Sequence, residues 1–113
     1  MTEPTVWIRV CTLKDLEPDA GVCALVEGEQ VAIFYLPRID QVYAISNFDP
    51  FSGANVLARG LTGSLGGEPV VASPIYKQHF SLKTGRCLED GQVAVPTYPV
   101  RIVHDWVEVG VSK

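Results

Sequence analysis

Short runs of β-branched and aromatic residues, separated by turn residues, constrain the fold of this chain more than any other feature. Residues 21–26 and 30–36 form two such runs, and the Glu-Gly-Glu sequence between them is typical of a hairpin turn. Residues 107–111 alternate valine with other residues after a turn at 104–105, which predicts a closing hairpin with one buried face. Strands that recur roughly every 8–12 residues favour an antiparallel sandwich or barrel. We therefore expect an all-β fold.

The remaining segments fit the same architecture. Strands are expected at residues 5–10 and 41–45, and a capped turn at 12–15, where a hydroxyl and a carboxylate can accept backbone N–H bonds. Residues 47–67 contain five glycines and one proline, so we expect a long loop there that connects two sheets. A loop of this length in a compact domain is usually functional.

The composition indicates one globular domain without a nucleic-acid or membrane partner. The chain has 113 residues, 47% hydrophobic and 19% charged, so we expect a single domain over 1–113 with its core at about 5–111. The net charge is -4 and no two of the 9 Lys and Arg residues are adjacent, which argues against phosphate binding. No apolar stretch approaches the roughly 20 residues that cross a bilayer, and the polar segment 1–4 is not expected to be a secretory signal.

Cysteines and histidines give no sign of a metal site or a catalytic triad. Cys11, Cys23 and Cys87 are odd in number and widely spaced, so we expect buried structural thiols in a reducing compartment and no disulfide framework. His79 and His104 have no Cys, His or carboxylate at a metal-like spacing, and the chain has no G-x-S-x-G turn. Both histidines are expected to have loop or surface roles.

Two segments resemble the paired cluster loops of Rieske proteins, which read C-P-H-x-G-A and C-P-x-H-G followed by F-x-x-x-T-G. They are residues 44–54 and 73–85. The residues that match the family's scaffold positions are Pro50, Gly53, Ala54, Pro74, Phe80, Thr84 and Gly85. The resemblance implies a Rieske-like antiparallel β-sandwich or barrel in which the two loops meet at one tip.

The four positions that hold the cluster in the family do not match. Asp49 and Ser73 stand at the two cysteine positions, and Phe51 and Tyr76 stand at the two histidine positions. A Rieske centre needs two thiolates on one iron and two imidazoles on the other. Phenylalanine has no lone pair, aspartate and serine offer hard oxygen, and a tyrosine phenol ionises only near pH about 10. We therefore expect no iron–sulfur cluster and no metal in this chain.

The cluster-free pattern over residues 49–52, 71–78 and 84–90 is similar to the small subunit of the cytoplasmic NAD(P)H-dependent nitrite reductase. The resemblance implies a non-catalytic subunit that supports reduction of nitrite to ammonium in nitrate and nitrite assimilation. It also implies a large-subunit partner that carries sirohaem, a [4Fe–4S] cluster and FAD and binds NAD(P)H. The alternative is a cluster-free Rieske-like protein-binding module of another oxidoreductase or dioxygenase system.

Aromatic residues at the former cluster tip have two possible roles. Phe51 and Tyr76 are expected to lie close together, because both occupy histidine positions of the motifs. With Phe48, they either fill the space that the cluster vacated or form an exposed patch for a partner. In the second case Arg59 and Lys77 would supply the polar rim.

Overall fold

Strand β3 (Glu29–Leu36) lies at the centre of the fold, because its side chains are buried on both faces of its sheet. Val31 and Ile33 pack in one apolar cluster, whereas Ala32 and Phe34 pack in another. Successive side chains of a strand point to opposite faces, so the sheet that contains β3 separates two cores. This explains why residues 30–36 read as a nearly continuous apolar run.

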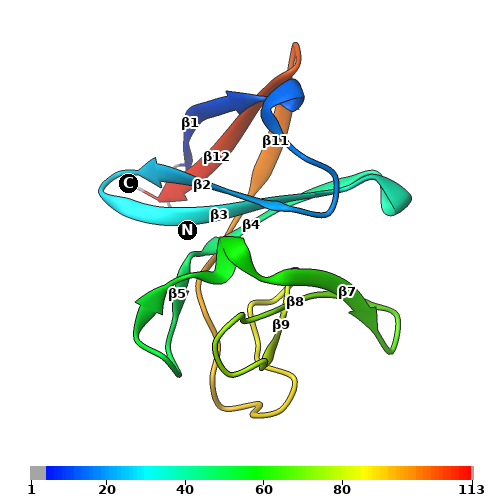
Figure 1. The fold of residues 1–113 in the computed structure, drawn as a ribbon. Helices are drawn as coiled ribbons and strands as arrows, with labels where there is room; N and C mark the ends of the chain where they lie inside the picture. The colour runs from blue at the N-terminus through cyan, green and yellow to red at the C-terminus, as the bar shows by residue number, and fades with distance from the viewer. Residues whose placement is uncertain (1–4, 113) are drawn as a thin grey trace.

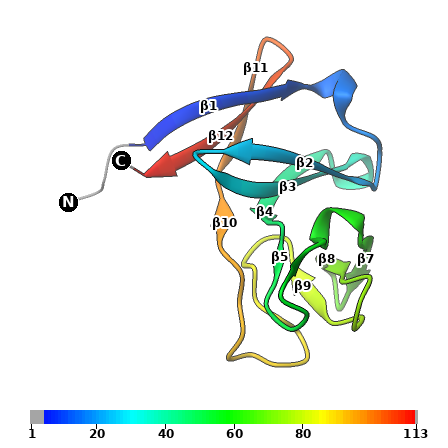
Figure 2. The ribbon, with the colours of Figure 1, turned by 60° about the vertical axis from the view of Figure 1, so that its left-hand side comes forward.

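Three layers result, and all pairs between named strands are antiparallel (Figures 1 and 2). The central sheet has the order β10-β4-β3-β2, with β2 at Gly21–Val26, β4 at Gln41–Ser46 and β10 at Thr97–Tyr98. The layer on one side has the order β1-β12-β11, with bounds Thr5–Thr12, Trp106–Ser112 and Val100–Val103. The layer on the other side holds β7-β8-β9 (Leu61–Leu65, Glu68–Ala72 and His79–Ser81) and the small hairpin β5-β6 (Phe48–Asp49 and Ala54–Asn55).

The expected all-β antiparallel fold is confirmed, as are the strands predicted from alternation. The expected capped turn is also present, as the 3-10 helix η1 (Leu13–Asp15). The Asp15 carboxylate accepts hydrogen bonds from the Thr12 backbone N–H at 2.9 Å and from the Thr12 hydroxyl at 3.0 Å. A second 3-10 helix, η2 (Pro37–Ile39), links β3 to β4.

The expectation of one long loop over residues 47–67 is wrong. This segment contains β5, β6, the 3-10 helix η3 (Leu57–Arg59) and β7. Gly66 and Gly67 have φ of 58° and 83° and form the tight turn of the β7–β8 hairpin, where positive φ favours glycine. The expectation of two sheets is wrong for the same reason, because the described residues form four sheets, two of them built from residues 48–81.

The three cysteines are free but differ in burial. Cys87 is buried and Cys11 is half-buried, and burial raises the pKa of both thiols. Cys23 is exposed, so the expectation of buried thiols is wrong there. Cys23 lies on β2, the edge strand of the central sheet, and its sulfur accepts a hydrogen bond from Asn47 Nδ2 at 3.6 Å.

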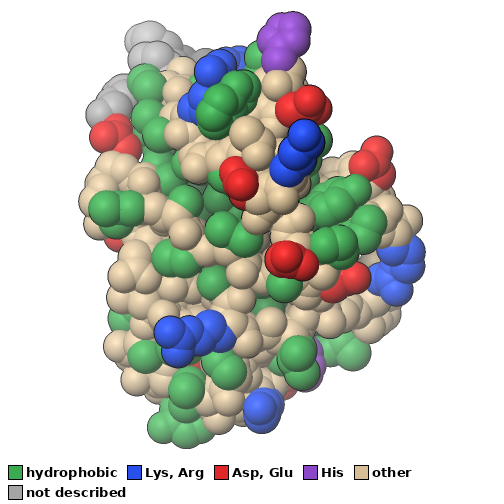
Figure 3. All heavy atoms as spheres, turned by 45° about the horizontal axis from the view of Figure 1, so that its top comes forward, with side chains coloured by type: hydrophobic (Ala, Val, Ile, Leu, Met, Phe, Trp, Pro, Cys, Tyr) green, Lys and Arg blue, Asp and Glu red, His purple; other side chains and the backbone are tan. Residues whose placement is uncertain are grey.

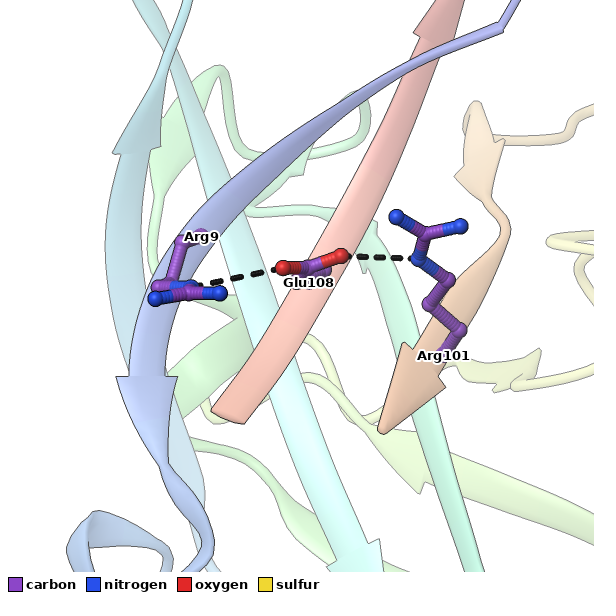
Figure 4. Close-up of polar contacts among 3 residues, drawn as sticks. All are labelled: Arg9, Arg101 and Glu108. Atoms are coloured by element: carbon purple, nitrogen blue, oxygen red, sulfur yellow. Dashed lines mark hydrogen bonds and ion pairs between the residues drawn. The ribbon is translucent and has the colours of Figure 1, made fainter. Parts of the chain in front are cut away.

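The outer face of the β1-β12-β11 sheet carries a network of charged and aromatic side chains. Glu108 accepts hydrogen bonds from Arg101 Nε at 2.7 Å and from Arg9 Nε at 3.3 Å (Figure 4). The hydrogen bond from Arg101 is the main cause that lowers the pKa of Glu108. The Arg9 guanidinium lies 4.8 Å from the ring centre of Trp106, and that of Arg101 lies 4.5 Å from that of Trp7. The network therefore ties the three strands of this layer together.

The structure is a computed structural model that describes residues 5–112. The segment 1–4, which gave the expectation of no secretory signal, lies outside the described residues, and the domain bounds 1–113 stay a prediction. Within the described residues, no helix has the length and apolar character needed to span a membrane. The face in Figure 3 shows acidic and basic side chains interspersed with apolar ones. No large patch of one charge is visible on that face.

Candidate functional site

The two Rieske-like loops meet at a buried contact between Asp49 and Ser73. Asp49 ends β5 and Ser73 directly follows β8, so the two residues approach from different sheets. Both are completely buried, and the Ser73 hydroxyl donates a hydrogen bond of 2.5 Å to Asp49 Oδ2. These are the two positions at which Rieske proteins carry cysteine. A hydrogen bond therefore joins the loops at the positions from which the family binds its inner iron.

Each partner of the Asp49–Ser73 contact also fixes the turn of its own loop. Asp49 Oδ1 accepts a hydrogen bond of 2.9 Å from the Phe51 backbone N–H, a local bond typical of aspartate in turns. The Ser73 hydroxyl oxygen accepts one of 3.3 Å from the Ile75 N–H, and the Ser73 carbonyl accepts one of 3.1 Å from the Lys77 N–H. Both loops are thus organised around one buried contact.

The two histidine positions differ from each other in their surroundings. Phe51 packs against the core cluster that contains Phe80, and the two ring centres lie 6.1 Å apart with planes inclined at 48°. Tyr76 is 60% exposed. The structure therefore favours a filling role for Phe51 and a surface role for Tyr76, while the expected closeness of their rings stays a prediction.

Apolar side chains from both loops reach the surface at this tip. Phe48 is 44% exposed and Ile75 is 48% exposed. We call these two residues, with the exposed Tyr76 and Lys77, the tip surface. Lys77 Nζ donates a hydrogen bond of 3.3 Å to the Pro74 carbonyl. The sequence analysis did not single out Ile75, although its position next to Tyr76 in the second loop was a usable signal.

Three further polar groups belong to the two loops or to the segment that follows the first loop. Arg59 ends η3 and is exposed. Within residues 5–112, the buried side-chain atoms that lack a hydrogen-bond partner are Ser52 Oγ and Gln78 Oε1. Ser52 belongs to the first loop and Gln78 to the second. Such atoms are few in folded proteins, so their position distinguishes the two loops from the rest of the domain.

The second loop is held at its far end by His79 and Glu89, a pair that the sequence reasoning missed. Glu89 Oε2 lies 2.6 Å from His79 Nδ1, and Glu89 Oε1 accepts a hydrogen bond of 2.8 Å from the His79 backbone N–H. Burial acts to raise the pKa of Glu89, but the hydrogen bonds from His79 outweigh it and lower the pKa. No motif links residues ten apart across an irregular segment, so no sequence signal was available. His104 is exposed in the β11–β12 turn, which confirms the surface role expected for it.

The Thr84-Gly85 match of the second motif has a structural role. Gly85 has φ of 78°, and a Cβ atom there would lie only 2.0 Å from the Val95 carbonyl oxygen. Glycine is therefore required by backbone conformation and by close approach. The nearby Ser81 hydroxyl is also buried and accepts hydrogen bonds from the Lys83 and Thr84 N–H groups, each at 3.2 Å.

These residues do not fit a Rieske cluster. Asp49 and Ser73 face each other in a hydrogen bond, the Phe51 ring packs on the core, and Tyr76 is turned to solvent. None of these side chains offers the thiolate or imidazole that the cluster needs. In the part of the chain that the structure describes, no group of three or more His, Cys, Asp or Glu residues is placed to hold a metal ion.

Comparison with known proteins agrees with this geometry. Residues 6–110 match the family of the Rieske-like [2Fe-2S] domain. The nitrite reductase (NADH) small subunit of Salmonella typhimurium is 52% identical over 96 residues, which cover 85% of this chain and 89% of that protein. The NMR structure of the Escherichia coli protein NirD superposes with a TM-score of 0.89 at 44% identity, covering 97% of this chain and 100% of that chain.

One relative has a different organisation. The nitrite reductase [NAD(P)H] large subunit of Klebsiella oxytoca contains a segment that is 44% identical over 104 residues. That segment covers 92% of this chain but only 11% of the Klebsiella polypeptide. The chain described here thus belongs to the Rieske-like family and, within it, to the small subunits of NADH nitrite reductase.

Proposed function

We propose that this chain is a non-catalytic small subunit of an NAD(P)H-dependent nitrite reductase and that it stabilises or positions the large subunit. The observation that carries this proposal is the 52% identity with the Salmonella small subunit along nearly the whole of both chains. The two loops support the non-catalytic role, because their side chains cannot bind a Rieske cluster. Asp49 and Ser73, at the two cysteine positions, are buried and hydrogen-bonded to each other. The complex would reduce nitrite to ammonium.

The Klebsiella relative supports the large subunit as the partner. In that protein a domain similar to this chain is part of the polypeptide called the large subunit. Covalent linkage keeps two domains at a high effective concentration, so a domain fused in one relative is a good candidate to bind the same protein as a separate chain. On this basis the partner of this chain is the nitrite reductase large subunit.

All redox groups of the complex are assigned to that partner. We expect sirohaem, a [4Fe–4S] cluster and FAD in the large subunit, together with the NAD(P)H site, because the tip residues of this chain offer no set of thiolates and imidazoles. We also place the complex in the cytoplasm, where the nicotinamide nucleotide is available.

The tip surface is the proposed contact with the large subunit. Phe48, Ile75 and Tyr76 are large exposed apolar groups that come from both loops. Apolar and aromatic groups with a polar rim are typical of interface centres, and Arg59 and Lys77 would supply that rim. The unpartnered Ser52 and Gln78 atoms support the same location, because incompletely satisfied polar groups gather at functional sites.

The test is a binding measurement between the purified chain and the purified large subunit. We expect the wild-type chain to form a stable complex, and we expect Tyr76→Ala and Phe48→Ala to weaken binding at least about tenfold each. Leu25→Ala is the matched control, because Leu25 is 71% exposed on β2 and lies outside the two loops. Failure of the wild-type chain to bind would reject the subunit role, and equal effects of all three substitutions would reject the tip as the contact.

A further inference from the structure

The Asp49–Ser73 contact joins two loops that each carry part of the tip surface. Phe48 precedes Asp49 directly in β5, and Ile75, Tyr76 and Lys77 follow Ser73 within four residues. The contact is completely buried, so it cannot touch a partner itself. Any effect of these two residues on binding must therefore act through the arrangement of the loops.

We propose that Asp49 and Ser73 are positioning residues that hold the tip surface in the shape that binds the large subunit. This inference rests on the proposed function. In a cluster-bearing relative, bonds to one iron tie the two loops together at these positions. In this chain the hydrogen bond of 2.5 Å between the Ser73 hydroxyl and the Asp49 carboxyl group supplies the link, at the short end of the range for O–H···O bonds.

The bonds around the contact transmit its position to the surface. Asp49 Oδ1 holds the Phe51 N–H, and the Phe51 ring anchors the first loop on Phe80. Ser73 binds the second loop through its hydroxyl to Ile75 N–H, its carbonyl to Lys77 N–H and its own N–H to the Gln78 carbonyl. Loss of the hydroxyl would remove the bond to Asp49 and the bond to Ile75 together. The loops would then sample other arrangements, and binding would have to select the competent one.

The environment of Asp49 makes the contact hard to replace. The ion pairs of the described residues involve Arg9, Arg101 and His79, and none of them includes Asp49. The buried carboxyl group of Asp49 therefore depends on the hydroxyl of Ser73 and the N–H of Phe51 for its side-chain hydrogen bonds. A buried polar group that loses one of its two hydrogen-bond partners favours any rearrangement that restores a partner, such as entry of water.

The experiment compares two buried serines in their effect on binding. Ser73→Ala removes the hydroxyl of the contact, and Ser81→Ala is the matched control, because Ser81 is equally buried and its hydroxyl also accepts backbone N–H bonds. Binding to the purified large subunit is measured at a temperature at which circular dichroism shows both variants folded. We expect Ser73→Ala to weaken binding at least tenfold and Ser81→Ala to change it less than threefold.

Two further measurements separate positioning from general stability. The single variant Asp49→Asn keeps the side-chain shape and can still bond both partners, with its Oδ1 accepting from the Phe51 N–H and its Nδ2 donating to the Ser73 hydroxyl, so it should retain most of the wild-type binding. Hydrogen exchange of the Phe51, Ile75 and Lys77 amides should become faster in Ser73→Ala while exchange of the β3 amides stays unchanged. If Ser73→Ala does not fold, Ser73→Cys, whose thiol is a weaker donor than the hydroxyl, carries the same comparison of binding with loop exchange.

The outcomes distinguish this inference from the proposed function. Normal binding by a folded Ser73→Ala variant, with weakened binding by Tyr76→Ala, would overturn the positioning role and leave the docking site in place. Equal losses of binding in Ser73→Ala and Ser81→Ala would also overturn it, because the effect would then follow stability alone. Absence of binding by the wild-type chain would reject the proposed function itself.

Discussion

Replacing Phe51 by alanine decides whether an aromatic ring at a former cluster-ligand position belongs to the core or to an interface. The side chain is half-buried, packs against the apolar cluster on one side of the central sheet and lies 6.1 Å from the Phe80 ring. Truncation would remove this packing while leaving the backbone N–H that donates to Asp49. The substitution therefore changes the filling of the tip and keeps the Asp49–Ser73 contact.

The size of the effect follows from the burial of the ring. Truncation of a fully buried phenylalanine to alanine lowers the free energy of unfolding by about 3–5 kcal/mol. Loss of an aromatic pair accounts for about 0.5–1.5 kcal/mol of this decrease. Because Phe51 is only half-buried, we expect a loss of about 2–3 kcal/mol in the free energy of unfolding. For a domain of this length, 1 kcal/mol corresponds to about 4 °C, so the Tm should fall by about 8–12 °C.

Thermal unfolding of the isolated chain, followed by circular dichroism, measures this effect. Tyr76→Ala is the matched control, because Tyr76 is 60% exposed and its truncation should cost less than about 0.5 kcal/mol. A fall of less than 2 °C for Phe51→Ala, equal to that of Tyr76→Ala, would refute the filling role. The Phe51 ring would then have to be an interface group, and the same variant should lose binding to the large subunit.

Four other predictions can be checked with the purified chain. Anaerobic reconstitution with iron and sulfide should leave it without a stoichiometric cluster, and an axial paramagnetic resonance signal after reduction would contradict the reading of the ligand positions. Titration with a thiol reagent under denaturing, non-reducing conditions should find all three cysteines, whereas a value of one would reveal a disulfide. Gly85→Ala should lower the free energy of unfolding by about 2–4 kcal/mol, because a left-handed backbone and a clash with a carbonyl oxygen both oppose the new Cβ atom. The control Gly53→Ala should lower it by only about 1–2 kcal/mol, because φ is 74° there but a Cβ atom would meet nothing within 4 Å. Glu108→Gln should lower the Tm most at neutral pH, and the Tm difference from the wild-type chain should shrink below pH 4.5. The reason is that the folded-state pKa of Glu108 is lower than its ordinary value, so its stabilisation is lost as the pH falls through that lowered pKa. A Tm difference that does not change with pH would contradict this.

Local signals were sufficient for most of the strands. The hairpin of β2 and β3 and the hairpin of β11 and β12 were predictable because alternation and turn residues act over a few neighbouring positions. His104 and Asp105 form the second turn with φ of 50° and 70°. The scaffold residues of both motifs, among them Pro74, Thr84 and Gly85, predicted the Rieske-like fold through their order and spacing, because they mark loop geometry and do not depend on the cluster.

Contacts between distant segments could not be predicted in the same way. Strand β7 contains Gly63 and is mostly exposed, so its strand character comes from pairing with β8 and not from its own composition. The motif comparison placed Asp49 and Ser73 at ligand positions, but nothing in the sequence indicates that residues 24 apart share a hydrogen bond. The inward direction of Phe51 likewise depends on Phe80, which a later strand brings beneath the first loop.

The pairing of the first strand with the last makes this domain modular. Thr5 lies opposite Ser112 in the β1–β12 ladder, so the chain enters and leaves the fold at one place. That ladder belongs to the layer on the far side of the central sheet from the two loops (Figure 1). A linker at either end would start away from the tip surface and leave it uncovered, whether the domain is a separate chain or, as in the Klebsiella relative, a segment of a longer polypeptide. If the tip surface is the contact that we propose, a fused and a separate domain would present it in the same way and would differ only in the tether.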